Sequence, residues 1–423
     1  MNGGDNLDKK ILIVSSWAPP MVGGPQHLYN IFSQFPKNAY SIITSAKNMQ
    51  KAIQTNIKGS MLPCQYYYFD EKCLSGHKDT AVNNASKNKT SLFSYFLAKP
   101  FLCGKIIIHY LFEVNLILLF SIKTMKALKE SRTNFLLGIS DTGPALIATY
   151  IASIITRTPY ALYLFDIYKG NNLGGFYNVL ASLFERAIMT RATIVIVTNE
   201  KTEQFYQQRY GNKIKTAVIH NSAFPDEYAK KRTPYRLTPP YNIVFTGNVY
   251  WAQEQSVLNL VSAMELLTDL PIKLHLYIPK PTEKLQNAVV NKSNIKLLTA
   301  NQSEMPKIQS DAALLFLPLS WDTKSPDIIA TASPGKFTDY LASGRPMLVH
   351  APDYSYIAKY VNKHHIGIIV DQNDTQLLAE KMRQFFEKPS LAQTYINQAL
   401  EIFQQEYDAV KNAQKMMRIL NDI

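Results

Sequence analysis

A lysine and an aspartate three residues apart, Lys336 and Asp339, are the residues whose types and spacing best fit chemistry on an anionic ligand. They stand in the stretch SPGKFTDYLASGRP, residues 333–346. On a helix this spacing places both on one side, where Lys336 can bind a phosphate and Asp339 can accept hydrogen bonds from a ribose diol. An i, i+3 ion pair on a solvated face explains the two residue types equally well. The two residues alone leave both interpretations open.

The stretch around these two residues has the end signals of a short helix. Ser333 is a suitable N-cap, Pro334 fits the first helical position, and Gly344 fits a left-handed C-terminal cap. Lys336 therefore falls in the first turn, where the helix dipole disfavours a cation. An anion bound at that end of the helix would explain the placement.

The elements that would hold this helix belong to an alternation of apolar runs and helical periodicity. Such alternation predicts parallel strands joined by helices. The predicted strands of this second half of the chain are 242–247, 272–278, 295–298, 312–318, 347–350 and 367–370. The other predicted helices are 253–267, 284–290, 354–361, 375–387 and a long terminal stretch, 391–420.

The first half of the chain shows the same alternation. The predicted strands are 11–14, 40–44, 65–69, 134–139, 160–165 and 193–197, and the predicted helices include 144–156, 176–190 and 201–210. Parallel sheets bind ligands at the carboxyl ends of their strands, where Ser140, Asp141 and Asp166 fall. A turn or N-cap role is the commoner one for such residues. Gly23 and Gly24, after the first strand, allow close approach of a phosphate or sugar, although a glycine pair also marks an ordinary turn.

Length and charge limit the classes of protein. A chain of 423 residues predicts two domains of roughly 200 residues each. Apolar residues at 46% and charged residues at 18% indicate a globular protein. The net charge of +13 calls for an anionic partner, either nucleic acid, nucleotide phosphates or an anionic membrane surface. The 25 tyrosines are not interleaved with basic residues in an RNA-binding pattern, so no nucleic acid is expected.

Several kinds of chemistry lack their motifs. The sequence has no P-loop, no HExxH and no GxSxG, and its eight histidines are scattered, so no metal site is expected. Cys64, Cys73 and Cys103 are odd in number and lack metal spacing, which favours a reducing compartment without disulfides. The first apolar run, 11–14, is interpreted as a strand and not as part of a signal peptide. A cytoplasmic protein is therefore expected.

The segment 91–129 is long and apolar enough to suggest a bilayer span, but Lys105, His109 and Glu113 recur every four residues. They form one polar stripe on a helix, which argues against spanning. A helix buried in the first domain is slightly favoured, because layered α/β domains need such helices. The alternative is a helix lying in an anionic membrane interface, with three following lysines at the headgroups. These are Lys123, Lys126 and Lys129.

Taken together, the order of elements and several strings resemble the GT-B glycosyltransferases of family 4, retaining enzymes that use nucleotide-sugar donors. The loop PPMVGGPQH is similar to the family's PPxxGG pattern, and IHNSAF to its IPNGVD string. IVFTGNVYWAQ is similar to the opening of the family's C-terminal domain, and SPGKFTDYLASGRP to PxKxxEYLASGKP. The resemblance covers almost the whole chain and is weakest over residues 72–129. The order and spacing of the strings make it specific.

The resemblance implies an α/β protein with the GT-B fold, in which two Rossmann-like domains with mostly parallel sheets face a central cleft. It implies an acceptor-binding domain at residues 1–230 and a nucleotide-sugar-binding domain at 231–400. A C-terminal helix, 401–423, would cross back to the first domain. No cofactor and no metal requirement are implied, because the nucleotide-sugar is the substrate.

Carried over position by position, the resemblance gives each site residue a role. Asp339 matches the acidic residue that holds the ribose, Lys336 a basic residue at the diphosphate, and Asp166 an acidic residue of the cleft. One glycine loop lies beside the phosphates and another approaches the transferred sugar. The implied catalytic residues are Asp166 and Lys336, and the implied donor-binding residues are Gly23, Gly24, Gly247, Asn248, Ser333, Pro334, Gly335, Lys336 and Asp339.

The sequence departs from the family pattern in two places. Thr331 stands where the first of the family's paired glutamates would be, eight residues before Asp339. The basic pair that often follows the Gly247 loop is also missing. The phosphate charge is then left to Lys336, Lys280 and the amides at helix N-termini.

The implied activity is transfer of a sugar, with retention, from a UDP- or GDP-sugar to a polyprenyl-linked or polysaccharide acceptor in surface glycan biosynthesis. One alternative is a non-catalytic GT-B protein that binds a sugar nucleotide, and another is a sugar-nucleotide epimerase of the same fold. Peripheral contact with the cytoplasmic face of the inner membrane through residues 91–129 is the second interpretation of that segment. The sequence does not specify the sugar, base, acceptor or linkage.

Overall fold

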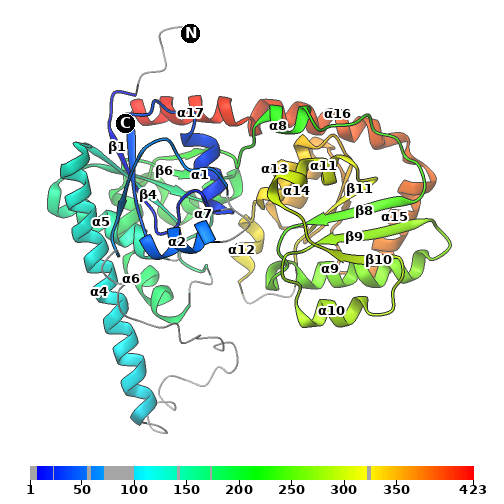
Figure 1. Cartoon of the computed structure of the whole chain (residues 1–423), viewed down its shortest axis with the longest axis horizontal. Helices are drawn as coiled ribbons and strands as arrows, with labels where there is room; N and C mark the ends of the chain where they lie inside the picture. Colours follow the sequence, from blue (N-terminus) through cyan, green and yellow to red (C-terminus); the bar gives the residue numbers. More distant parts are fainter. Residues whose placement is uncertain are drawn as a thin grey trace.

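The computed structural model describes residues 7–21, 23–54, 59–70, 100–140, 143–171, 174–321 and 325–423, with the backbone alone for 100–107. Among these residues the strands form two sheets, and every pair of neighbouring strands is parallel. The expectation of two α/β units with mostly parallel sheets is therefore confirmed. Figure 1 shows the two units side by side, with the C-terminal helices lying across both. Asp141 and residues 91–99 lie outside the described residues.

The seven-stranded sheet and its helices form the N-terminal lobe, with strand order β3-β2-β1-β4-β5-β6-β7. The strands are β1 Ile11–Val14, β2 Tyr40–Thr44, β3 Gln65–Tyr68, β4 Phe135–Ile139, β5 Tyr160–Leu164, β6 Val195–Val197 and β7 Thr216–Val218. The helices are α1 Gly24–Phe32, α2 Ala46–Gln54, α4 Pro100–Ser131, α5 Pro144–Thr156, α6 Gly175–Arg191 and α7 Glu200–Tyr210. Every residue of β1, β2, β4 and β5 is buried, because helices cover both faces of the sheet.

The six-stranded sheet and its helices form the C-terminal lobe, with strand order β10-β9-β8-β11-β12-β13. The strands are β8 Tyr241–Thr246, β9 Ile272–Tyr277, β10 Ile295–Leu298, β11 Leu314–Pro318, β12 Met347–His350 and β13 Ile368–Val370. The helices are α8 Pro225–Ala229, α9 Trp251–Ala263, α10 Glu283–Val289, α11 Met305–Ser310, α12 Pro326–Thr331, α13 Gly335–Ala342, α14 Tyr356–His364, α15 Thr375–Glu387 and α16 Ala392–Ile402, and the last helix of the chain, α17 Ala409–Asn421, packs on the N-terminal lobe. The predicted order of strands in this half is confirmed, and 295–298 and 347–350 match to the residue.

The single long terminal helix predicted over 391–420 is wrong. A π-helical turn, Phe403–Tyr407, follows α16, and Asp408 is extended before α17 begins. The carboxylate of Asp408 accepts hydrogen bonds from the backbone amides of Val410 and Lys411, which caps the new helix. The backbone of Asp408 also bridges to Ala223. The chain therefore turns here from one lobe to the other.

Helix α17 belongs to the core of the N-terminal lobe. Its buried side chains pack with α1 and with the first strands of the seven-stranded sheet. They are Ala413, Met416, Met417 and Leu420. The ammonium of Lys9, just before β1, donates a hydrogen bond to the carbonyl of Leu420. Figure 1 shows α17 beside α1, at the opposite end of the sequence.

The burial favoured for the 91–129 helix is only half right. The inner face of α4 packs against the lobe through residues such as Phe120, which stacks on Phe69. Of the polar stripe, Glu113 faces inward and accepts a hydrogen bond from the hydroxyl of Tyr177 on α6, whereas the side chain of His109 is 62% exposed. The outer face is apolar and 40 to 68% exposed at Ile108, Leu111, Phe112, Val114, Leu118 and Ile122. Among the described residues no helix is long and apolar enough to cross a bilayer.

Candidate functional site

Each sheet has one point where the chain reverses its direction of winding. In the N-terminal lobe this point lies between β1 and β4, and in the C-terminal lobe between β8 and β11. Open parallel sheets bind ligands beyond the carboxyl ends of the strands at such points, because the loops diverge there and leave a crevice. The structure places Gly24 and Asp166 at the first point and Gly247 near the second.

A pocket of about 260 Å³ lies at the first point. It is lined by residues that end β4, follow β1, β4 and β5, or begin α1, namely Ser15, Trp17, Gly24, Pro25, Ile139, Ser140, Phe165, Asp166 and Asn171. The hydroxyl of Ser140 accepts a hydrogen bond from the backbone of Phe165, so Ser140 has the turn role. Asp166 has no hydrogen-bond partner among the described residues, and its side chain remains available to a ligand.

The glycine pair has two different environments. Gly23 has a φ of 85° and precedes α1, and a side chain there would meet no atom within 4 Å. A Cβ on Gly24 would lie 3.5 Å from the ring of Phe165. Gly23 therefore provides the left-handed turn, and Gly24 allows the close approach beside the pocket.

The loop after β8 brings Gly247 against Lys336. Gly247 has a φ of 111°, which strains any other residue, and a Cβ there would lie 3.4 Å from Cε of Lys336. Asn248 is exposed in the same loop. Gly247, in the predicted phosphate loop, and Lys336, the predicted phosphate-binding cation, are thus neighbours in space. They are 89 positions apart in the sequence (336 − 247).

Helix α13 begins at Gly335, one residue later than the sequence indicates. Pro334 is the N-cap, and no side chain caps the helix, so the prediction of Ser333 as the N-cap is wrong. The ring of proline fixes φ at a value that suits an N-cap, but it carries no oxygen that could accept a hydrogen bond from the first turn of the helix. The buried hydroxyl of Ser333 has no hydrogen-bond partner in the described part of the chain. This hydroxyl and the amides of Gly335 and Lys336 form a set of donors suited to an anion.

Lys336 is half-buried and is not neutralised by a carboxylate. Its Nζ lies 4.1 Å from the centre of the Phe245 ring and donates a 3.4 Å hydrogen bond to Oε1 of Gln253. Burial lowers the pKa of Lys336 to about 7, and the charge of Asp339 opposes this shift. A lysine held in this way gains strongly from a bound anion, because the anion restores its preference for the charged form.

Asp339 is held by a tyrosine. The hydroxyl of Tyr228, on α8, donates a 2.6 Å hydrogen bond to Oδ1 of Asp339. Burial raises the pKa of Asp339 to about 6, and the bond from Tyr228 opposes the shift. No ion pair joins Lys336 to Asp339, and both side chains are half-buried, so the interpretation as a pair on a solvated face does not hold.

Two pairs of residues face each other across the cleft between the lobes. A Cβ on Gly335 would lie 3.1 Å from the imidazole of His27 on α1. Burial lowers the pKa of His27 to about 4, so the ring is neutral, and its buried Nδ1 has no partner among the residues that the structure describes. Opposite Asp166 stands Tyr250, where burial and the charge of Asp166 raise the pKa of the tyrosine to about 12. His27 was not singled out from the sequence, although it ends the string PPMVGGPQH.

The environment of Asp166 differs from that of an ordinary surface carboxylate. Its side chain reaches solvent, but the surrounding protein removes part of its hydration and raises the pKa of Asp166. A carboxylate at the mouth of a pocket, with no internal partner, can accept a hydrogen bond from a sugar hydroxyl.

Thr331, at the position of the family's first paired glutamate, does not direct its side chain to the cleft. It ends α12, and its hydroxyl donates to the carbonyl of Asp327 within the same helix. The carbonyl of Thr331 accepts a hydrogen bond from the side chain of Asn199 in the N-terminal lobe. Ile328 packs into the core of that lobe. Helix α12 therefore fastens the two lobes together and supplies no carboxylate to the cleft through Thr331.

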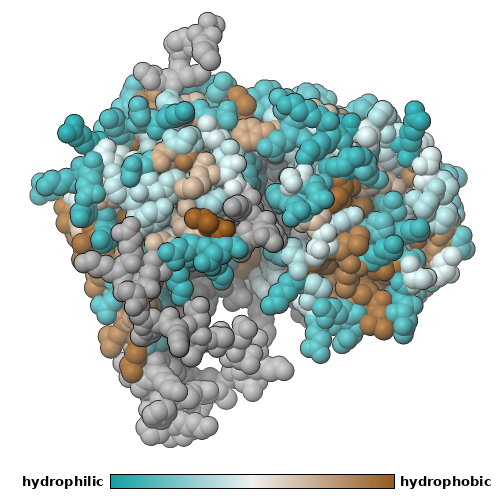
Figure 2. All heavy atoms as spheres, viewed as in Figure 1, coloured by the Kyte–Doolittle hydropathy of each residue, from teal (hydrophilic) through white to brown (hydrophobic). Residues whose placement is uncertain are grey.

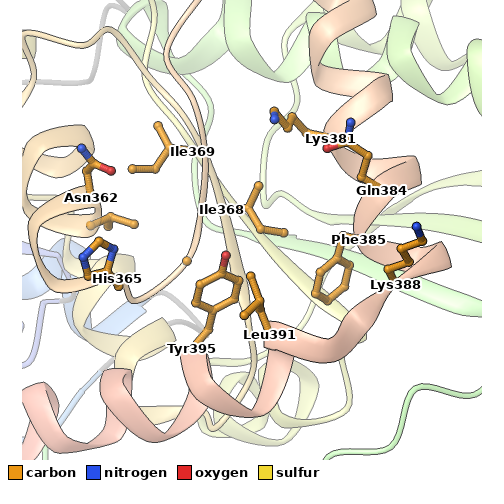
Figure 3. Close-up of a pocket in the computed structure, with 12 residues that line it drawn as sticks. Asn362, His365, Ile368, Ile369, Lys381, Gln384, Phe385, Lys388, Leu391 and Tyr395 are labelled. Carbon is orange, nitrogen blue, oxygen red and sulfur yellow. The ribbon is translucent and has the colours of Figure 1, made fainter.

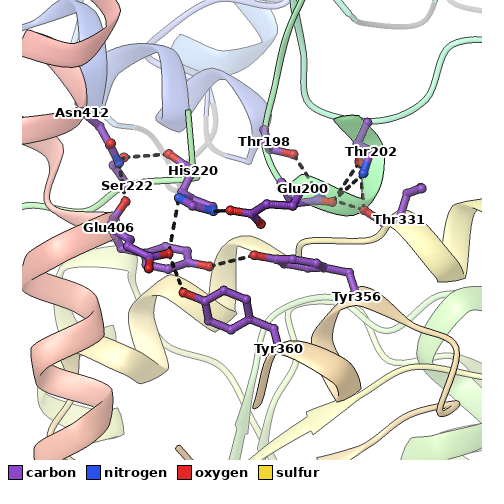
Figure 4. Close-up of polar contacts among 12 residues, drawn as sticks. Thr198, Glu200, Thr202, His220, Ser222, Thr331, Tyr356, Tyr360, Glu406 and Asn412 are labelled. Atoms are coloured by element: carbon purple, nitrogen blue, oxygen red, sulfur yellow. Dashed lines mark hydrogen bonds and ion pairs between the residues drawn. The ribbon is translucent and has the colours of Figure 1, made fainter. Parts of the chain in front are cut away.

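A polar cluster joins the lobes behind the cleft (Figure 4). His220, which is 6% exposed, lies with Nε2 3.0 Å from Glu200 of α7 and Nδ1 3.9 Å from Glu406. The hydroxyl of Tyr360 on α14 donates to Glu406. Ligand atoms of the three titratable residues lie within 4.8 Å, but the carboxylates face different ring nitrogens, which is the geometry of a hydrogen-bonded bridge.

Comparison with known proteins supports the fold. Residues 240–388 match the family described as "Glycosyl transferases group 1". A search of curated protein sequences finds no match.

Several solved structures share the fold over nearly the whole chain. A glycosyltransferase from Rickettsia africae has 13% identity and a TM-score of 0.65, with 98% of both chains covered. Anabaena Alr3699/HepE in complex with UDP and glucose has 15% identity and a TM-score of 0.65, with 98% of this chain and 100% of that chain covered. Sucrose-phosphate synthase from Thermosynechococcus elongatus has 12% identity and a TM-score of 0.67, with 97% and 98% covered.

Proposed function

We propose that this chain, which has the GT-B fold and a glycosyl transferases group 1 domain at residues 240–388, transfers a sugar from a nucleotide-sugar to an acceptor. One observation carries the proposal. The glycine loop after β8, the start of α13, which no side chain caps, and Lys336, which pairs with no carboxylate among the described residues, meet at one switch point, facing Asp166 and His27 of the other lobe. The proposed anion site and the pocket at Asp166 thus belong to different lobes and face each other.

The donor's diphosphate binds at α13. Lys336, the amides of Gly335 and Lys336, and the hydroxyl of Ser333 stabilise the negative charge that grows as the diphosphate leaves. Asp339 accepts hydrogen bonds from the ribose. A UDP- or GDP-sugar fits this set, and the complexes of Alr3699/HepE with UDP and UDP-glucose support a uridine donor.

The sugar itself lies across the cleft, against the glycine pair and Asp166. Closure of the lobes excludes water, so the acceptor is the available nucleophile. The departing phosphate oxygen takes the acceptor's proton, which requires no strong base from the protein, and substitution retains the anomeric configuration. The ring of His27 beside Gly335 is neutral, so in this proposal it does not compete with Lys336 for the charge of the diphosphate.

Activity is tested with labelled UDP- and GDP-sugars and a polyprenyl-linked acceptor. Lys336→Ala and Asp339→Ala are each expected to lower kcat/KM by about 100-fold, since each removes a charge-assisted contact to the donor. Lys296→Ala, an exposed lysine of β10, is the matched control and should change nothing. Transfer should continue in EDTA, because no step uses a metal. Transfer that both cleft variants leave unchanged would contradict the assignment of the site.

A non-catalytic binder is the second candidate, and Thr331 is the observation that favours it, because the position supplies no carboxylate to the cleft. A nucleotide-sugar would then raise the Tm without any transfer. Product analysis in the same assay separates transfer, simple binding and epimerisation of the sugar.

We further propose that the acceptor is lipid-linked and that the protein meets an anionic membrane through the outer face of α4 and α6. On α6, Val179, Leu183 and Phe184 are 37 to 67% exposed. The rings of Tyr110 on α4 and Phe176 on α6 stack 4.9 Å apart, so the two outer faces adjoin. Figure 2 shows hydrophobic residues gathered along the edge where α4 runs. An apolar face of this extent on a chain with a net charge of +13 suits a lipid interface.

Flotation with anionic liposomes tests the membrane contact. The wild type should float at low salt and less at high salt, because lysines near the headgroups act electrostatically. Leu111→Glu combined with Leu183→Glu should abolish flotation at both salts. Leu266→Glu combined with Val290→Glu makes the same change at exposed apolar sites of the other lobe and should float like the wild type. Equal flotation of all three proteins would rule out the α4 and α6 face.

A further inference from the structure

A second pocket lies on the C-terminal lobe, bounded by α14, β13, α15 and α16 and separate from the cleft (Figure 3). Its volume is about 440 Å³, which is within the range of small-molecule sites. The lining residues are Val361, Asn362, His365, Gly367, Ile368, Ile369, Lys381, Gln384, Phe385, Lys388, Leu391 and Tyr395.

The charge of this pocket is of one sign. Lys381 lies on α15 and Lys388 directly follows it, His365 faces them from the end of α14, and no lining residue is acidic. Within the described part of the chain neither lysine forms an ion pair. Figure 3 shows the amide of Asn362 and the ring of His365 on one side, and the polar ends of Lys381 and Gln384 on the other. The positive charge of the pocket is therefore free to meet a ligand.

The floor of the pocket is apolar. Phe385 is buried, Ile368 is partly buried, and Leu391 is 54% exposed at the rim. The hydroxyl of Tyr395 points up between the two polar walls in Figure 3. An apolar body can rest on this floor while polar groups reach the walls, which is the usual composition of a binding pocket.

The backbone of β13 adds a donor and an acceptor. The strand is at the edge of the sheet, and the carbonyl of Val370 accepts from Ala351, on the β12 side. Peptide groups alternate in direction along a parallel strand, so the N–H and C=O of Ile369 point away from β12, toward the pocket. A ligand in the pocket can pair with both.

We propose that this pocket binds a small organic anion, with an aromatic or apolar body on the floor and a phosphate or carboxylate between Lys381 and Lys388. The cleft around Lys336 belongs to other elements, so the two sites can be filled independently. This site does not depend on the proposed transferase activity.

Calorimetric titration with phenyl phosphate tests the site, with UDP present at saturation to fill the cleft. We expect a Kd on the order of 1 mM. Phenol and inorganic phosphate, which each carry half of the proposed chemistry, should bind at least about tenfold more weakly.

Variants separate this pocket from general surface charge. Lys381→Gln with Lys388→Gln should weaken phenyl phosphate at least about tenfold, because two charge-assisted contacts are lost. Leu391→Glu places a negative charge at the rim, where it would repel the phosphate of the ligand. This variant should also weaken binding at least about tenfold. Lys273→Gln with Lys296→Gln makes the same charge change on exposed strands of the lobe and should leave the Kd within twofold.

Three results would overturn the proposal. They are an unchanged Kd in both pocket variants, loss of binding in Lys336→Ala instead, and binding of inorganic phosphate as tight as that of phenyl phosphate.

Discussion

At the scale of single residues, burial brings the pKa values of Lys336 and Asp339 close together. The lysine has a pKa of about 7 and the aspartate a pKa of about 6. Both groups are charged together only in the narrow range between those values, because the lysine loses its proton above it and the aspartate gains one below it. The donor site should therefore respond to small changes in pH near neutrality.

We expect the affinity for a UDP-sugar to be greatest between about pH 6 and 7. Above pH 7 the empty site must take up a proton on Lys336 to bind the diphosphate, so affinity should fall, by about tenfold at pH 8. Below pH 6 protonated Asp339 accepts fewer hydrogen bonds from the ribose, and affinity should fall again. Titration across this range measures both limbs.

Variants assign each limb of this profile to one residue. Lys336→Ala should bind the UDP-sugar weakly, and its affinity should not fall above pH 7. The affinity of Asp339→Asn should not fall below pH 6. A wild-type profile that stays flat from pH 5.5 to 8.5 would refute the titration of both groups, since their pKa values lie inside that range.

Sequence patterns point to part of this candidate site. Lys336 and Asp339 are singled out because a cation in a first helical turn and an aspartate three residues later on the same side are local signals, whereas Gly247 comes from the family resemblance. His27 and Gly335 are neighbours in space but 308 positions apart in the sequence (335 − 27). No local sequence pattern can therefore predict that they meet. The bond from Tyr228 to Asp339 was missed for the same reason.

At the scale of elements, strands were predicted better than helix ends. A buried parallel strand is a continuous apolar run, as in LLFLP of β11, and such runs are visible in the sequence. The break between α16 and α17 was not visible, because apolar residues such as Phe403 and Tyr407 continue through it. The change of backbone direction at Asp408 depends on its pairing with Ala223 in the other half of the chain.

The cap at Asp408 gives a prediction about this break. Asp408→Ala should lower the free energy of unfolding by about 1 kcal/mol, because two amides of α17 lose their acceptor. Asp408→Asn keeps a capping oxygen and should lie within a few tenths of a kcal/mol of the wild type. Urea unfolding followed by circular dichroism measures the difference. Equal losses in both variants would show that the charge, and not the cap, matters.

At the scale of the whole molecule, the two lobes are joined by specific polar bonds. The amide of Asn221 donates to the carbonyl of Ser333, and the hydroxyl of Thr338 donates to the carbonyl of Asn221. These bonds end on α13 and the residue two before it, so the helix that would hold the donor is also part of the junction. We therefore expect donor binding at α13 to be coupled to domain closure through these shared residues.

The bridge through His220 makes the junction sensitive to acid. Burial acts to raise the pKa of Glu200, but the hydrogen bond and charge of His220 outweigh it and hold that pKa at about 2. A carboxyl with a depressed pKa stabilises the fold above its ordinary pKa of 4.5, and this contribution is lost as pH falls toward 2.

Glu200→Gln should accordingly have a lower Tm than the wild type at pH 6, and the gap should close as pH falls from 4.5 toward 2. Glu380→Gln, on the exposed side of α15, is the control and should match the wild type at both ends of the range. A gap of constant size would mean that the carboxylate of Glu200 does not act through its charge.

The return of α17 to the N-terminal lobe has a consequence for synthesis. Ala413, Met416 and Leu420 complete a core whose other walls, β1 and α1, leave the ribosome before the C-terminal lobe does. Domains commonly fold in order as they emerge, but this lobe must keep part of its apolar core open until the C-terminal lobe has been made. The first lobe to be synthesised is thus the last to be finished. A newly made chain acquires its cleft only when both lobes are complete.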